Sequence, residues 1–246
     1  MTPQLKTRLS CYLKLILEVF FPSHCISCQN IIRRNSLFCH DCFIKLQFIT
    51  EPKCKICSYP FEIEIPDMSS LCGKCLIKKP SFDKLVTIFS YNHIIRKAIT
   101  SLKYHDQTFL SKKLAILLKE KAKNEIDNCD IIAAIPLHLN RLRKRKFNQA
   151  SIIAKNLSKN KFIPDLIWRV KDTTPQVSLR KKQRKSNLKR AFLVNKKYRT
   201  FLKNKKILLI DDVITTGATI ENCARELKRR DVKEVVVLTI AKTIFD

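Results

Sequence analysis

The sequence predicts an α/β fold, in which a mostly parallel sheet is flanked by helices and preceded by a small cysteine-rich module. Three observations indicate this fold. Apolar runs alternate with helical patterns after Pro80, four CxxC pairs precede it, and one apolar run leads into two aspartates and a hydroxyl-rich turn. Continuous apolar runs are typical of parallel strands buried on both faces. The chain has 246 residues, 45% of them hydrophobic, which excludes a mostly disordered protein.

The first 22 residues are expected to form a docking helix that ends at Pro22, because their apolar residues recur near helical spacing. The best apolar run, residues 11–22, is too short to span a membrane and contains Lys14 and Glu18. It also lacks the small-residue cleavage site of a secretory signal. We therefore expect no transmembrane segment and a cytoplasmic location.

Eight of the 11 cysteines form four CxxC pairs, which are Cys25, Cys28, Cys39, Cys42, Cys54, Cys57, Cys72 and Cys75. Two such pairs can close a tetrahedron of thiolates around one ion. A secreted disulfide framework rarely repeats one spacing four times, and iron–sulfur spacings are absent. The pattern therefore predicts two structural zinc ions, which replace a core that so short a segment cannot build.

The spacing alone does not decide which two CxxC pairs share one zinc ion. Pairing of consecutive CxxC pairs gives two small ribbons, and interleaved pairing gives a cross-brace. We favour the consecutive arrangement because shorter loops lose less entropy on closure. His24 and His40 flank ligands and are expected at the surface, since the cysteine count is complete. Cys11, Cys129 and Cys223 are isolated and are expected to be small buried hydrophobic residues.

After Pro80 the cysteine pairs stop, and the alternation of strands and helices implies βαβ units. We expect strands over residues 84–91, 130–135, 206–210 and 234–240, and helices over residues 93–103, 109–123, 148–157 and 219–229.

One of these strands leads into the most informative motif, because Asp211 and Asp212 follow residues 206–210 and a Thr-rich turn precedes the next helix. Ligands of parallel sheets bind at the carboxyl ends of the strands. Hydroxyls, backbone N–H groups and a helix N-terminus suit a phosphate, whereas paired carboxylates suit the vicinal hydroxyls of a sugar near Mg²⁺. One of only two glycines, Gly217, lies here. A simple helix cap needs one such residue, so the motif predicts a phosphorylated-sugar site.

The net charge of +28 predicts a polyanionic partner, although a general lysine bias is the alternative. The charge is concentrated, since residues 141–206 contain 23 Lys and Arg residues but only Asp165 and Asp172 as acids. The densest stretch provides the candidate nucleic-acid contacts Arg141, Arg143, Lys144, Arg145 and Lys146.

Residues 210–219 (IDDVITTGAT) resemble the phosphoribosyl pyrophosphate (PRPP) signature of type I phosphoribosyltransferases. Nearly the whole chain resembles the ComF family of competence-associated, phosphoribosyltransferase-like proteins. That resemblance rests on the CxxC pairs together with residues 102–104 (LKY), 143–150 (RKRKFNQA), 174–176 (TPQ) and 184–192 (RKSNLKRAF). Together with the patterns above, it divides the chain into an expected docking helix at 1–22, a double zinc ribbon at 23–80 and a phosphoribosyltransferase-like domain at 81–246.

The resemblance also implies roles for individual residues. Asp211 and Asp212 would bind the ribose hydroxyls of PRPP, with Mg²⁺ nearby. The 5′-phosphate would be held by Thr215, Thr216, Gly217, Ala218 and Thr219, and the pyrophosphate would be approached by Lys103, Tyr104, Arg180, Arg184 and Lys185. Single-stranded DNA and the DNA-uptake machinery would be partners.

Two glycines of the family pattern are missing. Lys146 stands where the family has the glycine of RRGFNQA, and His105 and Asp106 stand where another is expected. If that first glycine adopts a positive φ, Lys146 costs about 1 kcal/mol. No glutaminase domain is recognisable, so glutamine-dependent amidotransfer is not expected. Two hypotheses stay open: a Mg²⁺-dependent phosphoribosyltransferase with an unidentified acceptor, and a PRPP-responsive DNA-binding protein.

Overall fold

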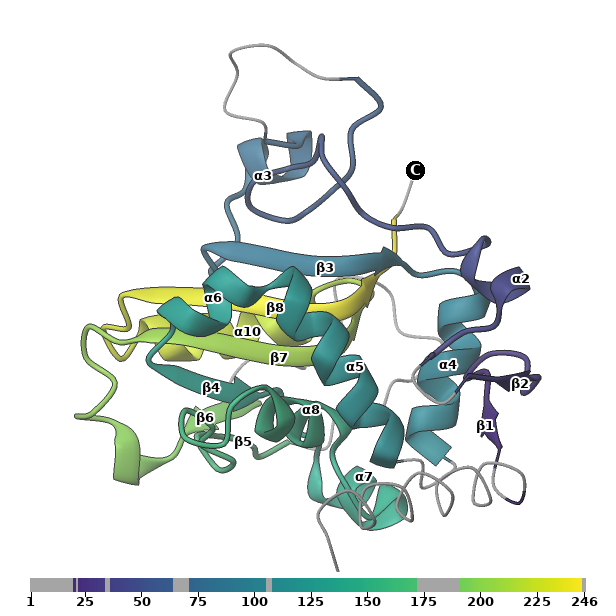
Figure 1. Cartoon of the computed structure of the whole chain (residues 1–246). Helices are drawn as coiled ribbons and strands as arrows, with labels where there is room; N and C mark the ends of the chain where they lie inside the picture. The colour runs from purple at the N-terminus through teal and green to yellow at the C-terminus, as the bar shows by residue number, and fades with distance from the viewer. Residues whose placement is uncertain are drawn as a thin grey trace, which may run out of the picture.

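The computed structural model describes residues 20, 22–33, 36–63, 71–104, 108–171 and 191–244. Its centre is a four-stranded sheet in which every neighbouring pair is parallel (Figure 1). The strands lie in the order β3 (Lys84–Ser90), β8 (Glu234–Lys242), β7 (Lys206–Ile214) and β4 (Ile131–Ala134). The predicted α/β class with a parallel sheet is confirmed, and the strands form from the continuous apolar runs.

Both faces of the sheet are covered. Side chains of β7 alternate between two hydrophobic cores, since Leu208 and Ile210 belong to one core and Ile207 and Leu209 to the other. The first core is filled from α4 (His93–Tyr104), α5 (Thr108–Lys121), α6 (Lys123–Asn128) and α8 (Gln149–Leu157), and the second from α10 (Ala218–Lys228) and the hairpin of β5 (Ile167–Arg169) and β6 (Phe192–Val194). Figure 1 shows α5, α6 and α8 on one side of the sheet and α10 on the other.

The cysteine-rich part consists of short elements, which are β1 (Ser23–His24), β2 (Ile31–Ile32), α2 (His40–Phe43) and α3 (Gly73–Ile77). Cys25, Ile26 and Cys42 pack into the first core together with α4 and α5. The segment that follows α2 runs along the edge strand β3, because the amide of Ile49 donates to the carbonyl of Ile88 at 2.8 Å. This segment protects the end of an edge strand from pairing with other chains.

Some elements differ from the expected ones, among them α7 (Leu139–Arg145), which was not expected. The strand expected at 206–210 continues to Ile214, because β8 offers ladder partners that outweigh the low strand propensity of aspartate. The helix expected at 109–123 is two helices, since Ala122 has non-helical backbone angles. The β5–β6 hairpin was not expected. The expected docking helix lies almost wholly outside the described residues, and no helix within them is long and apolar enough to cross a membrane.

Candidate metal centres and phosphate-binding edge

The eight paired cysteines form two separate clusters. The sulfur atoms of Cys25, Cys28, Cys39 and Cys42 all lie within 4.8 Å of one another, and so do those of Cys54, Cys57, Cys72 and Cys75. A tetrahedral zinc site with Zn–S bonds of ~2.3 Å brings its sulfurs to about 3.8 Å from one another. Each four-thiol set therefore fits one structural zinc ion. Consecutive pairing is confirmed, and the interleaved alternative is wrong.

Backbone amides favour a thiolate in each cluster. Burial raises the pKa of Cys25, but the backbone N–H groups of Cys28, Cys39 and Ser27 outweigh burial and lower that pKa to about 7. Cys54 follows the same pattern in the second cluster, and its pKa is also lowered to about 7. Because zinc binds the deprotonated thiol, these amides prepare each cluster for the metal.

The other sulfur and imidazole groups agree with the sequence analysis. His24 and His40 are exposed. Cys129 and Cys223 are buried, and burial raises the pKa of both thiols. Cys11 lies outside the described residues. Lys242 was missed by sequence reasoning, since no local motif marks it, although its side chain contacts Cys57 of the second cluster.

Because the sheet is parallel, all four strands end at one edge, called here the carboxyl edge. Asp211 and Asp212 lie on β7 near this edge and are half-buried. The Oδ1 atom of Asp211 accepts the N–H of Asp212 at 2.9 Å, and the Oδ1 atom of Asp212 accepts the N–H of Val213 at 2.8 Å. These bonds fix the orientation of both carboxylates on the strand.

The turn after β7 leads directly into α10. Thr215 and Thr216 are exposed, whereas Gly217, Ala218 and Thr219 are half-buried. Gly217 has φ 71° and ψ 0°, a left-handed conformation that glycine adopts without the cost paid by other residues. The N–H groups of the first turn of α10 and the helix dipole make this turn suitable for an anion. The N–H of Thr243 donates to the carbonyl of Ile214 at 2.8 Å and ties the end of β8 to the turn.

The basic stretch follows β4, which pairs with β7, so its start lies at the same edge. Helix α7 (Leu139–Arg145) contains Arg141, Arg143 and Arg145, and only the backbone of Lys144 is described. Lys146 has φ 65°, so the condition under which a lysine at this position costs energy is met. Asn148 fixes the stretch to the strand, because its Nδ2 donates to the carbonyl of Ile135 at 2.9 Å while its Oδ1 caps α8.

The other residues expected to approach PRPP lie in or beside parts of the chain that the structure does not describe. Lys103 and Tyr104 end α4, and only their backbone is described. Arg180, Arg184 and Lys185 lie outside the described residues.

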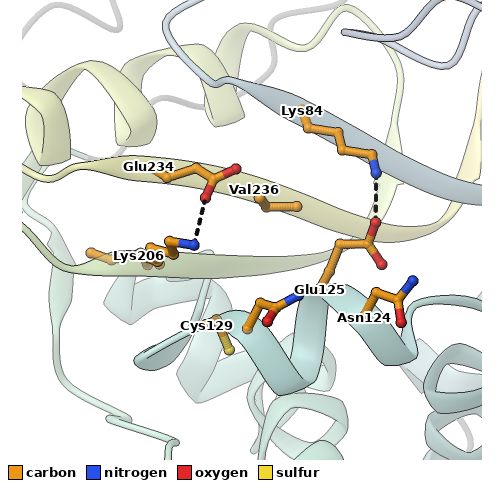
Figure 2. A pocket seen from close by; sticks show the side chains of 9 residues that line it. Lys84, Asn124, Glu125, Cys129, Lys206, Glu234 and Val236 are labelled. Carbon is orange, nitrogen blue, oxygen red and sulfur yellow. Dashed lines mark hydrogen bonds and ion pairs between the residues drawn. The ribbon is translucent and has the colours of Figure 1, made fainter.

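A pocket of about 260 Å³ lies at the opposite edge, where β3, β7 and β8 begin (Figure 2). Its charged groups pair with each other. The Nζ of Lys84 lies 2.6 Å from a carboxylate oxygen of Glu125, and the Nζ of Lys206 lies 3.9 Å from one of Glu234. Ligands of parallel sheets bind at the other edge, so this pocket is not the expected sugar-phosphate site.

Comparisons with known proteins agree with this arrangement. Residues 16–76 match the family model "Double zinc ribbon domain", and residues 147–243 match "Phosphoribosyl transferase domain". Competence protein F of Haemophilus influenzae is 33% identical, over 91% of this chain and 98% of its own length. DNA utilization protein YhgH of Escherichia coli is 28% identical, over 70% of this chain and 78% of its own length. Competence protein ComFC of Streptococcus pneumoniae is 26% identical, over 85% of this chain and 89% of its own length. The chain therefore belongs to the ComF family of phosphoribosyltransferase-like proteins with an N-terminal zinc module.

Proposed function

We propose that the protein binds PRPP with Mg²⁺ at the carboxyl edge and handles single-stranded DNA during DNA uptake. The observation that carries the PRPP proposal is the left-handed turn at Gly217, which joins the two aspartates of β7 to the N-terminus of α10. A sugar diol and a phosphate on one ligand need these two kinds of group side by side.

In this proposal the 5′-phosphate lies against residues 215–219 and accepts hydrogen bonds from backbone N–H groups and threonine hydroxyls. Asp211 and Asp212 accept hydrogen bonds from the ribose hydroxyls. Their charge also attracts Mg²⁺, which would neutralise part of the pyrophosphate.

The proposed DNA role is supported by the names of the relatives and by charge. Two relatives are competence proteins and one is a DNA utilization protein. Residues 141–206 contain 23 basic and two acidic residues, which favours a polyanion such as DNA. The exposed Arg143 and Lys146 lie beyond β4. Such a role implies a cytoplasmic location and contact with the DNA-uptake machinery.

Isothermal calorimetry with PRPP tests the proposed site. Saturable binding that requires Mg²⁺, with weaker binding of ribose 5-phosphate or pyrophosphate alone, is the expected result. Absence of binding at millimolar PRPP would overturn the PRPP proposal. Release of pyrophosphate on addition of ammonia, nucleobases or DNA would identify a phosphoribosyltransferase, because each is a possible nucleophile at the anomeric carbon.

A further inference from the structure

The β5–β6 hairpin has a buried face and an exposed apolar face. In the antiparallel register Trp168 lies opposite Leu193, and Arg169 lies opposite Phe192. Side chains alternate along each strand, so Trp168 and Leu193 share the outer face with Val170. These three side chains are 50%, 38% and 48% exposed, respectively, whereas Phe192 is buried in the core. Within the part of the chain that the structure describes, the outer face therefore offers exposed apolar surface.

The chain around this outer face is strongly basic. Residues 161–171 and 191–206 contain nine Lys and Arg residues and a single acid, Asp165. The carboxylate of Asp165 accepts hydrogen bonds from the Tyr198 hydroxyl and the Asn195 amide, both at 2.9 Å. Lys196 and Lys197 follow β6 after one residue and are exposed. Within residues 161–171 and 191–206, the nine basic residues are thus accompanied by one carboxylate, and that carboxylate is hydrogen-bonded within the fold.

We propose that the outer face of the hairpin is a stacking platform for a base of single-stranded DNA, with Trp168 as the stacking ring and nearby lysines as phosphate contacts. An exposed indole in basic surroundings is the combination by which proteins bind single strands without sequence preference. In duplex DNA the bases are already stacked on each other, so their faces are not available to Trp168. An acidic protein would satisfy the lysines but has no requirement for an exposed indole. The inference rests on the proposed DNA role and specifies its contact surface.

The chain contains one tryptophan, so fluorescence excited selectively at tryptophan reports on the surroundings of Trp168. The full-length, zinc-loaded protein is titrated with an oligothymidylate and with an abasic chain of equal length, while the anisotropy of a labelled oligonucleotide reports binding independently. We expect the oligothymidylate, and not the abasic oligonucleotide, to quench the fluorescence of Trp168. Trp168→Ala should weaken the binding of the oligothymidylate roughly 5- to 100-fold, the effect of losing one stacked base. Trp168→Phe should keep most of the affinity, and Ile116→Ala, which removes an exposed apolar side chain from α5, should change nothing.

The other possible results would overturn different parts of the proposal. DNA binding without quenching, and with Trp168→Ala unchanged, would overturn the stacking platform and leave the DNA role intact. Equal quenching by the abasic chain or by polyglutamate would also overturn stacking, and would identify the occupant as a general polyanion or an acidic protein. No binding to DNA by either readout would overturn the DNA role itself, whereas PRPP binding is measured separately by calorimetry.

Discussion

The ammonium group of Lys242 lies 2.6 Å from the carbonyl oxygen of Cys57 and 3.4 Å from the Cys57 sulfur. Lys242 is the last residue of β8 and pairs with Ile214, the last residue of β7 before the glycine turn. One side chain therefore connects the second cysteine cluster with the strand beside the candidate phosphate site. A cation so close to a thiolate offsets part of the negative charge that four thiolates place around zinc.

Replacing Lys242 by Met should loosen zinc at the second cluster, because the thiolate of Cys57 loses both a hydrogen-bond donor and a neighbouring positive charge. Loss of such a supporting group typically lowers metal affinity by about 10- to 100-fold. The measurement is the rate of zinc transfer to a chromophoric chelator, where one of two phases should accelerate. Lys55→Met is the matched control, since Lys55 is an exposed lysine between Cys54 and Cys57. Equal rates in both variants would refute the role of Lys242.

Replacing Asp211 or Asp212 by Asn should weaken PRPP binding by at least tenfold. Asparagine keeps the shape and one acceptor oxygen, but loses the charge that attracts Mg²⁺ and the second oxygen available to a sugar hydroxyl. Calorimetry with PRPP and Mg²⁺ measures the loss, while zinc content and melting temperature should stay the same.

Glu234→Gln is the control for this pair, because Glu234 is a carboxylate at the opposite edge of the same sheet. We expect it to bind PRPP like the wild type. Weakened binding in Glu234→Gln, with unchanged binding in the aspartate variants, would move the site to the pocket in Figure 2.

Much of the fold is readable from the sequence because its signals are local. Continuous apolar runs such as residues 206–210 identify buried strands without knowledge of their neighbours. Two residues between thiols already define half of a tetrahedral site, so the eight ligands were found from spacing alone. The sequence raised a positive φ at Lys146 as one possibility, because Lys146 stands where the family has glycine, and the structure shows this φ.

The rest depends on contacts between distant residues. Lys242 and Cys57 are 185 positions apart, and nothing in either segment indicates the other. The strands of the β5–β6 hairpin have three residues each, too short for an alternating pattern to be recognised. The outer position of Trp168 follows only from their register. Likewise, β7 continues through Asp211 because β8 supplies its hydrogen-bond partners, which local propensity does not reveal.

Loss of the first zinc site should destabilise the protein more than loss of the second. Cys42 belongs to the large core that contains α4 and α5, whereas Cys75 belongs to a small separate cluster. Cys42→Ser should therefore expose part of the main core and lower the melting temperature markedly, and Cys75→Ser should lower it less. Circular dichroism measures both transitions, and metal analysis should find about one zinc ion per chain in each variant. A larger effect of Cys75→Ser would contradict this reading of the cores.

Glu221 connects α10 to the segment before β3. Its carboxylate accepts hydrogen bonds from the amide of Ser81 at 2.8 Å, from the Ser81 hydroxyl at 2.7 Å and from Arg225 at 2.7 Å. Burial raises the pKa of Glu221, but these donors outweigh burial and lower the pKa below its ordinary value. A lowered pKa in the folded state gives stability that is present above the unfolded pKa and lost as the pH falls through the folded pKa.

Glu221→Gln should therefore lower the free energy of unfolding at pH 7 by about 1–2 kcal/mol, since a hydrogen-bonded charge is replaced by a neutral amide. The difference from wild type should shrink as the pH falls below the ordinary pKa of glutamate and through the lower pKa of folded Glu221, because the wild-type carboxylate then becomes protonated. Urea unfolding at several pH values measures this difference in the free energy of unfolding. Glu120→Gln, a change at an exposed position on α5, should give no such convergence. A difference that stays constant with pH would show that the charge of Glu221 does not contribute.

Lys146→Gly should stabilise the protein, because Lys146 adopts φ 65° between α7 and α8. A lysine in this left-handed conformation costs about 1–2 kcal/mol relative to glycine. Glycine also gives the unfolded chain more conformational entropy, which offsets part of the relieved backbone strain. We therefore expect the free energy of unfolding, measured with urea, to rise by about 0.5–1 kcal/mol. Lys146→Ala removes the same charge and side chain but keeps a Cβ atom, so it should give no gain. If alanine stabilises as much as glycine, relief of charge repulsion in the basic stretch is responsible, and the backbone at residue 146 is not strained.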